Sequence, residues 1–106
     1  MARGDVFWAS LPPSDRRPVL IVTRSGARHS KVTVAPVTRT VRGIASEVPL
    51  GVREGLRWRC VANVDDLLSV PRAILDAEPA GRLGPDGHRQ LDQALMYALE
   101  IRTAAG

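Results

Sequence analysis

Hydrophobic and polar residues alternate with a period of two over several short segments of the chain, and the period changes near the C-terminus. A period of two is typical of β-strands, because successive side chains of a strand point to opposite faces of its sheet. Turn-forming residues separate these segments, so we predict about six short strands. Five lie in GDVFWASL, residues 19–23, KVTVAPVT, residues 48–50 and LRWRCVANV. Residues 67–70 either continue as a strand or bend toward a short helical piece at PRAIL.

Two of these segments have distinct faces. In GDVFWASL, Val6 and Trp8 are expected on one face and Phe7 and Ala9 on the other, which suits a strand covered on both sides. In LRWRCVANV, the face that we expect to be buried holds Leu56, Trp58, Cys60, Ala62 and Val64. Because Cys60 shares this apolar face, it is predicted to be a buried structural thiol rather than a nucleophile.

Prolines mark two places where the strand pattern is broken. The segment PPSDRRP contains three prolines and is predicted as a short loop, with Arg17 at the mouth of the strand that follows. Pro36 has no N–H to donate to a ladder, so we expect it at a bulge, a sheet edge or a strand end. Thr38 then lies where the ladder is interrupted.

A helical period begins after Gly84, with Pro85 favoured in the first turn. The apolar positions at helical spacing are Leu91, Ala94, Leu95, Ala98 and Leu99. They predict one amphipathic helix of about 17 residues. Many short strands followed by one helix indicate a mainly β fold, a small β-barrel with a C-terminal helix that closes one opening or covers one edge.

Length and hydropathy set the remaining bounds. The 106 residues predict one domain, residues 1–106, with a modest core that a homodimer would supplement. The longest aliphatic runs, such as residues 19–22, are far shorter than the roughly 18 apolar residues of a membrane span. Asp5 stands where a signal peptide would have its apolar region. We therefore expect a cytoplasmic protein with no membrane partner.

The charge balance favours a polyanionic partner. The formal net charge is +4, with fourteen arginines and a single lysine, Lys31. A basic surface of this kind is typical of nucleic-acid binding. A GC-rich genome would also favour arginine over lysine, together with the Ala, Gly and Pro seen here, and both explanations remain open.

The chain offers few residues for metal or nucleophilic chemistry. His29 and His88 lie far apart in sequence, and Asp65 and Asp66 are adjacent, so that they point apart in a strand or occupy a turn. Cys60 is the only cysteine and has no partner at metal-ligand spacing. No glycine-rich phosphate loop occurs, so we expect neither a metal nor a cofactor.

Arg17 and Thr38 remain as candidates. Arg17 precedes Pro18, which disfavours helical backbone at Arg17 and directs it at the start of a strand. A guanidinium can bind two phosphate oxygens at once, and Thr38 offers a hydroxyl donor. The alternative is a solvated arginine beside an ordinary strand threonine, and spacing alone leaves it open.

Five segments then occur in a characteristic order, namely RGDVFWASL, RRPVLIV, VTVAPVT, EVPLG and CVANVDDLLSVPRAIL. Together they extend over nearly the whole chain, which resembles the MazF/PemK toxin family of ribosome-independent endoribonucleases, or mRNA interferases. The resemblance implies an SH3-like β-barrel with a C-terminal helix that forms a homodimer. It also implies inhibition by a cognate antitoxin, whose disordered tail occupies the RNA groove.

The family pattern places its two catalytic residues on Arg17 and Thr38 of this sequence. The implied reaction is metal-independent, sequence-specific cleavage of single-stranded RNA by attack of the 2′-hydroxyl on the adjacent phosphate, giving a 2′,3′-cyclic phosphate and a 5′-hydroxyl. Arg16, Arg39 and Arg42 are expected to contact RNA. The alternative for each of these three is a plain surface charge.

One segment departs from the family pattern. The loop before the RRP step, which is longer and contains glycine and glutamine in similar proteins, is reduced here to PPSD, residues 12–15. This puts the cleavage sequence in doubt, and with it the choice of mRNA over tRNA or rRNA as the target. Two other functions remain as alternatives: a CcdB-like toxin that binds DNA gyrase, against which the tail EIRTAAG lacks a tryptophan, and an inactive RNA-binding barrel.

Overall fold

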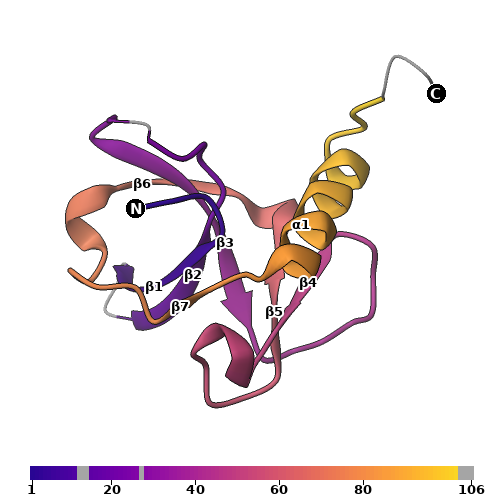
Figure 1. Ribbon diagram of the computed structural model, residues 1–106, viewed down its shortest axis with the longest axis horizontal. Coiled ribbons are helices and arrows are strands. Elements are labelled where there is room, and N and C mark those ends of the chain that lie inside the picture. The colour runs from indigo at the N-terminus through magenta and orange to yellow at the C-terminus, as the bar shows by residue number, and fades with distance from the viewer. Residues whose placement is uncertain (12–14, 27, 103–106) are drawn as a thin grey trace.

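Figure 1 shows the computed structural model of the protein, which describes residues 1–11, 15–26 and 28–102. Within these residues the strands are β1 (Asp5–Leu11), β2 (Asp15–Ile21), β3 (Lys31–Thr38), β4 (Glu47–Leu50), β5 (Cys60–Asn63), β6 (Leu68–Pro71) and β7 (Gly81–Arg82). The helical segments are α1 (Pro85–Ala98) and three short 3-10 turns, η1 (Val52–Glu54), η2 (Val64–Asp66) and η3 (Arg72–Ile74).

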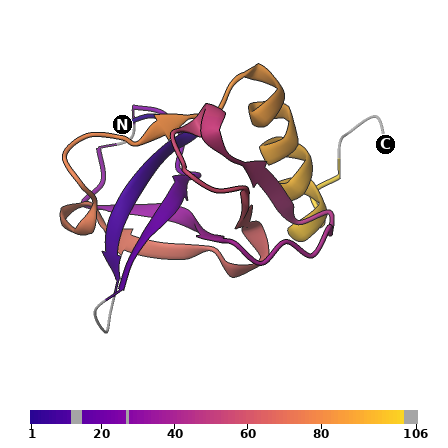
Figure 2. The same cartoon turned by 90° about the horizontal axis from the view of Figure 1, so that it is seen from below.

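The strands form one antiparallel sheet in the order β4-β5-β3-β2-β1-β7, with β6 also paired to β3. The sheet curls strongly, and α1 lies beside β4 at one end of the curl (Figures 1 and 2). The expected architecture, mainly β with a C-terminal helix, is confirmed. Both structures predicted from residue 67 onward are present one after the other. The strand β6 covers Leu68–Pro71, and the 3-10 turn η3 follows it directly.

Apolar side chains fill both sides of the curled sheet. Val6 and Leu20, which are paired across β1 and β2, belong to one core cluster, and the next pair along, Phe7 and Val19, belongs to a second. Alternation along a strand produces this division, as the sequence predicts for β1. The apolar stripe of α1 closes the first cluster, where it buries Leu91, Ala94 and Leu95.

The helix is shorter than its sequence period suggests. It ends at Ala98, and the side chain of Leu99 is exposed. Glu100 has φ 53°, in the left-handed region, while its N–H donates to Tyr97 O and the N–H of Ile101 donates to Met96 O. These two bonds form a Schellman motif, which satisfies the last carbonyls and stops the helix one turn early.

The segment before Pro18 is a strand rather than the predicted loop. Within β2, Asp15 pairs with Leu11 and Arg17 pairs with Ala9 of β1. The ladder with β1 continues past the proline and overrides the local turn signal, because cross-strand pairing outweighs intrinsic preference at short range. Residues 12–14 lie outside the described residues. Arg17 is therefore held by strand pairing, not by a loop.

The strand predicted at residues 56–64 is also corrected, since β5 begins only at Cys60. Leu56 is buried, but Trp58, expected on the same buried face, is 56% exposed. The cause lies just upstream, where Gly55 follows η1 with φ 84° and a Cβ there would collide with the carbonyl of Ala80 on the neighbouring segment. This close approach turns the chain and prevents the strand from starting at Leu56.

Pro36 lies where the ladder along one edge of β3 is interrupted, as expected. Residues 31–34 pair with β6 and residues 37–38 pair with β5, so residues 35–36 have no partner along that edge. The η2 turn between β5 and β6 lies in contact with β3. Thr38 is thus the last residue of β3, beyond the gap, at the end of the sheet.

A pair of glycine substitutions tests the close approach at Gly55. Gly55→Ala adds a Cβ that meets backbone atoms and strains a positive φ, so we expect the free energy of unfolding to fall by about 2 kcal/mol or more. Gly26 also has a positive φ, 78°, but open space around it, so Gly26→Ala is the matched control with a cost of about 1 kcal/mol. Urea denaturation measures both. Equal losses would show that backbone contact at Gly55 contributes nothing.

Candidate functional site

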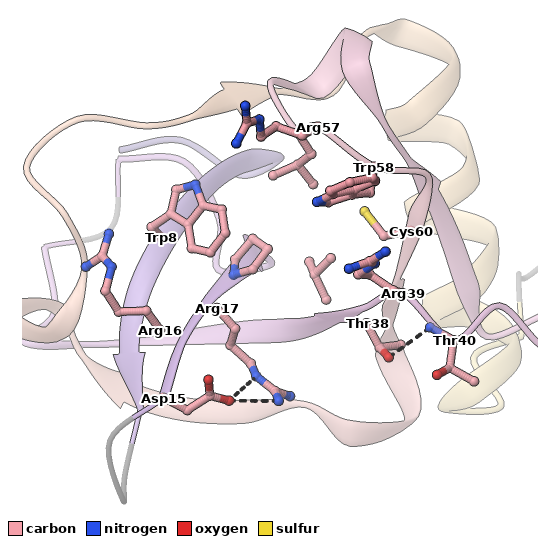
Figure 3. A pocket seen from close by; sticks show the side chains of 13 residues that line it. Trp8, Asp15, Arg16, Arg17, Thr38, Arg39, Thr40, Arg57, Trp58 and Cys60 are labelled. Atoms are coloured by element: carbon pink, nitrogen blue, oxygen red, sulfur yellow. Dashed lines mark hydrogen bonds and ion pairs between the residues drawn. The ribbon is translucent and has the colours of Figure 1, made fainter.

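A pocket of about 560 Å³ opens where β2 begins and β3 ends. Trp8 of β1 lies on one side, and residues 56–58 with Cys60 lie on the other. Residues 15–18 and 37–40 complete the lining (Figure 3). Strand ends and a connecting loop thus supply most of its polar side chains, while buried strands hold them in position.

The pairing of β2 with β3 brings Arg17 and Thr38 together. The β2–β3 ladder ends at the pair Val19 and Pro36, and Arg17 and Thr38 each lie two residues beyond this pair, on neighbouring strands. Residues two apart share a face of the sheet, so both side chains lie on the face of Val19 and Pro36. The two residues line the same pocket (Figure 3).

Asp15 forms an ion pair with Arg17. The Oδ2 atom of Asp15 accepts a hydrogen bond from Nε of Arg17 at 3.0 Å and lies 2.8 Å from an Nη atom of the same guanidinium. The two side chains are 52% and 44% exposed, so solvent screens the attraction. One edge of the Arg17 guanidinium is therefore occupied by a carboxylate that an incoming anion would have to displace.

The hydroxyl of Thr38 accepts a hydrogen bond within the protein and is still available as a donor. Its Oγ1 atom accepts a hydrogen bond from the backbone N–H of Thr40 at 3.1 Å. A hydroxyl that accepts one bond in this way still has its O–H to donate. Thr38 can therefore donate to an oxygen placed in the pocket beside Arg17.

Arg16 points away from Arg17 and is paired with Asp76. Two hydrogen bonds of 2.9 and 2.8 Å join the guanidinium to the carboxylate, and Arg16 Cζ lies 5.9 Å from the centre of the Trp8 ring. The hydrogen bonds with Asp76 raise the pKa of Arg16, and in the same way Arg16 lowers the pKa of Asp76. Arg16 thus contributes its charge at the rim of the pocket while it is held by its partner.

Of the other two predicted RNA contacts, the pocket contains only Arg39. Its Cζ atom lies 4.4 Å from the centre of the Trp58 ring, a cation–π contact on the side of the pocket nearest Thr38 (Figure 3). Arg42 does not line the pocket, and its backbone N–H donates to the carboxylate of Glu47 at 3.1 Å. The structure therefore brings together Arg16, Arg17, Thr38 and Arg39, and leaves Arg42 outside.

Trp8, Trp58 and Asp15 are among the pocket residues that the sequence analysis does not assign to a site. Trp8 and Trp58 were assigned to strand faces, and Asp15 to a loop, yet all three line the pocket. A signal for Trp58 is present in the sequence, because Arg57 and Arg59 flank it on both sides. Aromatic residues between cations are typical of nucleic-acid-binding surfaces.

Cys60 lies at the floor of the pocket as a buried thiol. Its Sγ atom is 3.8 Å from the carbonyl oxygen of Leu50, its partner in the β4–β5 ladder. Burial raises the pKa of the Cys60 thiol, and the negative charge of Glu54 raises it further. The structural role expected from the sequence agrees with this environment.

Two absences concern only the part of the chain that the structure describes. Its histidine, cysteine, aspartate and glutamate side chains form no group of three or more that could hold a metal ion. His88 instead lies against Gly4, and the Asp65 carboxylate accepts a hydrogen bond from Ser46 at 2.5 Å. No described helix is long and apolar enough to cross a membrane.

Comparison with known proteins gives the family. Residues 2–99 match the family of PemK-like, MazF-like toxins of type II toxin-antitoxin systems, and the chain belongs to this family. Among curated relatives, the probable endoribonuclease MazF5 of Mycobacterium tuberculosis is 37% identical over 102 residues, which cover 93% of each chain. A second relative from this organism, probable endoribonuclease MazF2, is 40% identical over 75 residues, 68% of this chain and 72% of its own. The protein is thus an enzyme of the endoribonuclease class.

Solved structures agree with the fold. The Mycobacterium tuberculosis toxin MazF-mt6 superimposes with a TM-score of 0.86 at 34% identity, covering 93% of this chain and 99% of its own. A mycobacterial endoribonuclease solved in complex with its cognate antitoxin gives a TM-score of 0.84 at 25% identity, covering 97% and 98%. The resemblance inferred from the five ordered segments is confirmed.

The buried thiol leads to a prediction about reactivity. Native Cys60 should react with iodoacetamide more than about tenfold more slowly than a cysteine in an unfolded peptide, because burial disfavours the thiolate and restricts access. Since the folded pKa lies above the unfolded one, the stability that the neutral thiol contributes is complete below the ordinary thiol pKa and is lost at more alkaline pH. Mass spectrometry of alkylation with and without urea measures the difference. A native rate equal to the rate in urea would contradict this environment.

Proposed function

We propose that this protein is the toxin of a type II toxin-antitoxin system that cleaves single-stranded RNA at specific sequences, independently of the ribosome and of a metal ion. The observation that carries the proposal is that Arg17 and Thr38, beyond the last pair of the β2–β3 ladder, line one pocket with further arginines. Single-stranded RNA suits such a pocket, since its bases can be splayed apart and its 2′-hydroxyl is free to react.

The reaction is an internal transesterification. The 2′-oxygen of the RNA bonds to the adjacent phosphorus as the bond to the 5′-oxygen breaks, leaving a 2′,3′-cyclic phosphate and a 5′-hydroxyl. The proton leaves the 2′-hydroxyl, and the departing 5′-oxygen takes up a proton. Negative charge accumulates on the non-bridging oxygens in the transition state, so donors placed there lower the barrier.

Arg17 and Thr38 are assigned complementary roles in this reaction. The guanidinium of Arg17 binds two phosphate oxygens and neutralises the developing charge. Thr38 donates its hydroxyl proton to a non-bridging oxygen. An arginine side chain is a poor general base near neutral pH, because it remains protonated there, and charge stabilisation is therefore the role assigned to Arg17.

Arg16, Arg39 and Arg42 are proposed to contribute to RNA binding through their charge. Arg16 and Arg39 lie at the pocket, whereas Arg42 would contact the strand beyond it. Phosphate contacts of this kind position the strand and carry little sequence information. The roles assigned to these three arginines do not include selection of mRNA over tRNA or rRNA. Residues 12–14 of the shortened loop lie outside the described residues.

The proposal extends to partners and assembly. A mycobacterial neighbour was solved with its cognate antitoxin, which supports a cognate antitoxin for this toxin too. We further propose that residues 1–106 act as one domain, that two copies form a homodimer and that the protein acts in the cytoplasm. A domain of this size gains stability by self-association. Sedimentation equilibrium that finds only monomer at micromolar protein would contradict the dimer.

Substitution of the two catalytic candidates tests the mechanism. Arg17→Ala and Thr38→Ala should each lower the cleavage rate by about 10² to 10³, since each removes a donor to the transition state. Arg89→Ala is the matched control, because Arg89 is an exposed arginine on α1 outside the pocket. Rates are measured on a short single-stranded RNA, alongside the same RNA with a 2′-deoxy nucleotide at the cleaved position.

The deoxy substrate should remain intact at that position, since it lacks the attacking hydroxyl. Continued cleavage there would exclude attack by the 2′-oxygen. Full activity of either variant would remove that residue from the site. Tight RNA binding with no cleavage by the unaltered protein would favour the inactive RNA-binding barrel.

Asp15 gives a second test of the site. Asp15→Asn removes the charge that occupies one edge of Arg17, so RNA affinity should rise by about three- to tenfold at low salt, with a smaller gain at high salt. Asp86→Asn is the control, because Asp86 forms an ion pair with an arginine on α1. Fluorescence anisotropy with labelled RNA measures both. Unchanged affinity would show that Asp15 does not compete with phosphate, and slower cleavage at unchanged affinity would assign it a role in proton transfer.

A further inference from the structure

Trp58 is a large aromatic side chain that the fold leaves uncovered in the pocket. It is 56% exposed, although Leu56 and Cys60, two residues away on either side, are each buried. An exposed tryptophan of this kind is unfavourable in water unless another group covers it. The indole therefore presents an apolar surface inside a pocket that also contains four arginines.

The segment that carries Trp58 is held in place from both ends. Upstream, the Glu54 carboxylate accepts a hydrogen bond from the N–H of Gly51 at 2.7 Å, and Leu56 N–H donates to Gly51 O at 3.1 Å. The close approach of Gly55 to Ala80 anchors the same turn. Downstream, Cys60 begins β5. The backbone around Trp58 is thus preorganised, which lowers the entropic cost of binding a ligand there.

Arg39 orients the ring. Its guanidinium lies 4.4 Å from the centre of the indole, and Arg39 directly follows Thr38 in the chain. A planar guanidinium over one part of an indole restricts the rotation of both side chains. The stacked pair therefore includes the chain neighbour of a proposed catalytic residue, and all three residues line the pocket (Figure 3).

We propose that Trp58 is a stacking platform for one nucleobase of the RNA, the base next to the cleaved phosphate, and that Arg39 is the positioning residue that holds the indole for it. The proposal rests on the proposed function, because it takes RNA as the ligand. Each base has a flat π-face that suits an exposed indole. The phosphate of the same nucleotide would lie near Arg17 and Thr38.

The charges around the platform favour RNA over a peptide. Arg16, Arg17, Arg39 and Arg57 line the pocket, against one carboxylate, Asp15. A strand that repeats a phosphate and a flat base matches alternating cations and an aromatic surface. Since stacking tolerates every base, Trp58 would set the position of the strand and supply affinity, and would discriminate only weakly among sequences.

The experiment combines a protein variant with an abasic scan of the RNA. The probe is the labelled RNA cut by the protein, with a 2′-O-methyl group at the cleaved position so that binding is measured without cleavage. An abasic nucleotide is placed at each position in turn, and dissociation constants are measured by fluorescence anisotropy. Trp58→Ala should weaken binding of the intact RNA by about 10- to 100-fold.

The decisive result is that one abasic position weakens binding to the unaltered protein but not to Trp58→Ala. The abasic nucleotide next to the cleaved position should weaken binding to the unaltered protein by a similar factor, and to Trp58→Ala by less than about twofold, as expected for two groups that interact. Trp58→Phe keeps an aromatic face and should retain most of the affinity. Tyr97→Ala, which removes an exposed aromatic side chain from α1, should bind as the unaltered protein does.

Two outcomes would overturn the platform. The first is an abasic penalty that is the same for Trp58→Ala and the unaltered protein at every position. The second is equal RNA affinity of the two proteins. If that equal affinity is accompanied by weaker antitoxin binding of Trp58→Ala, the indole is assigned to a protein partner instead. Failure of the proposed function would appear first, as an unaltered protein that leaves unblocked RNA intact, whereas failure of the platform would appear only in the binding comparison on an RNA that the protein cuts.

Discussion

The pairing of β2 with β3 is the constraint on which the site depends. Val19 opposite Pro36 sets a register that carries Arg17 and Thr38 to the same end of the ladder and the same face of the sheet. A slip of one residue would turn one of the two side chains to the opposite face. The apolar clusters on both sides of the sheet oppose such a slip, since it would expose residues that are now buried. Core packing therefore positions the reactive groups.

Three arginines of the pocket already have partners in the protein. Arg17 is paired with Asp15, Arg16 with Asp76, and Arg39 with the ring of Trp58. All these contacts lie at or near the surface, where solvent screening makes each of them weak. A polyanion can replace the carboxylate partners of Arg16 and Arg17 with its own phosphates at modest cost. The pocket thus holds its cations in defined orientations before RNA arrives, and still leaves them available.

The sequence predicted the elements well wherever one period dominates. β1, β3 and β4 lie where alternation places them, and α1 follows its apolar stripe. The predictions were wrong where a contact between segments far apart in the sequence determined the local structure. Pairing with β1 made a strand of Asp15 and Arg17, and the approach of Gly55 to Ala80 kept Trp58 out of β5. Neither contact leaves a local pattern, because each joins segments that are separated along the chain.

The sequence by itself determined the family, the mainly β architecture and the two leading candidates, Arg17 and Thr38. Ordered motifs and local periodicity carry that information within short segments. Only the tertiary structure decided that these residues line one pocket, that Asp15 occupies an edge of the arginine and that Trp58 lines the same pocket. Such facts depend on strand register and on backbone approach, and both emerge only when distant segments pack against one another.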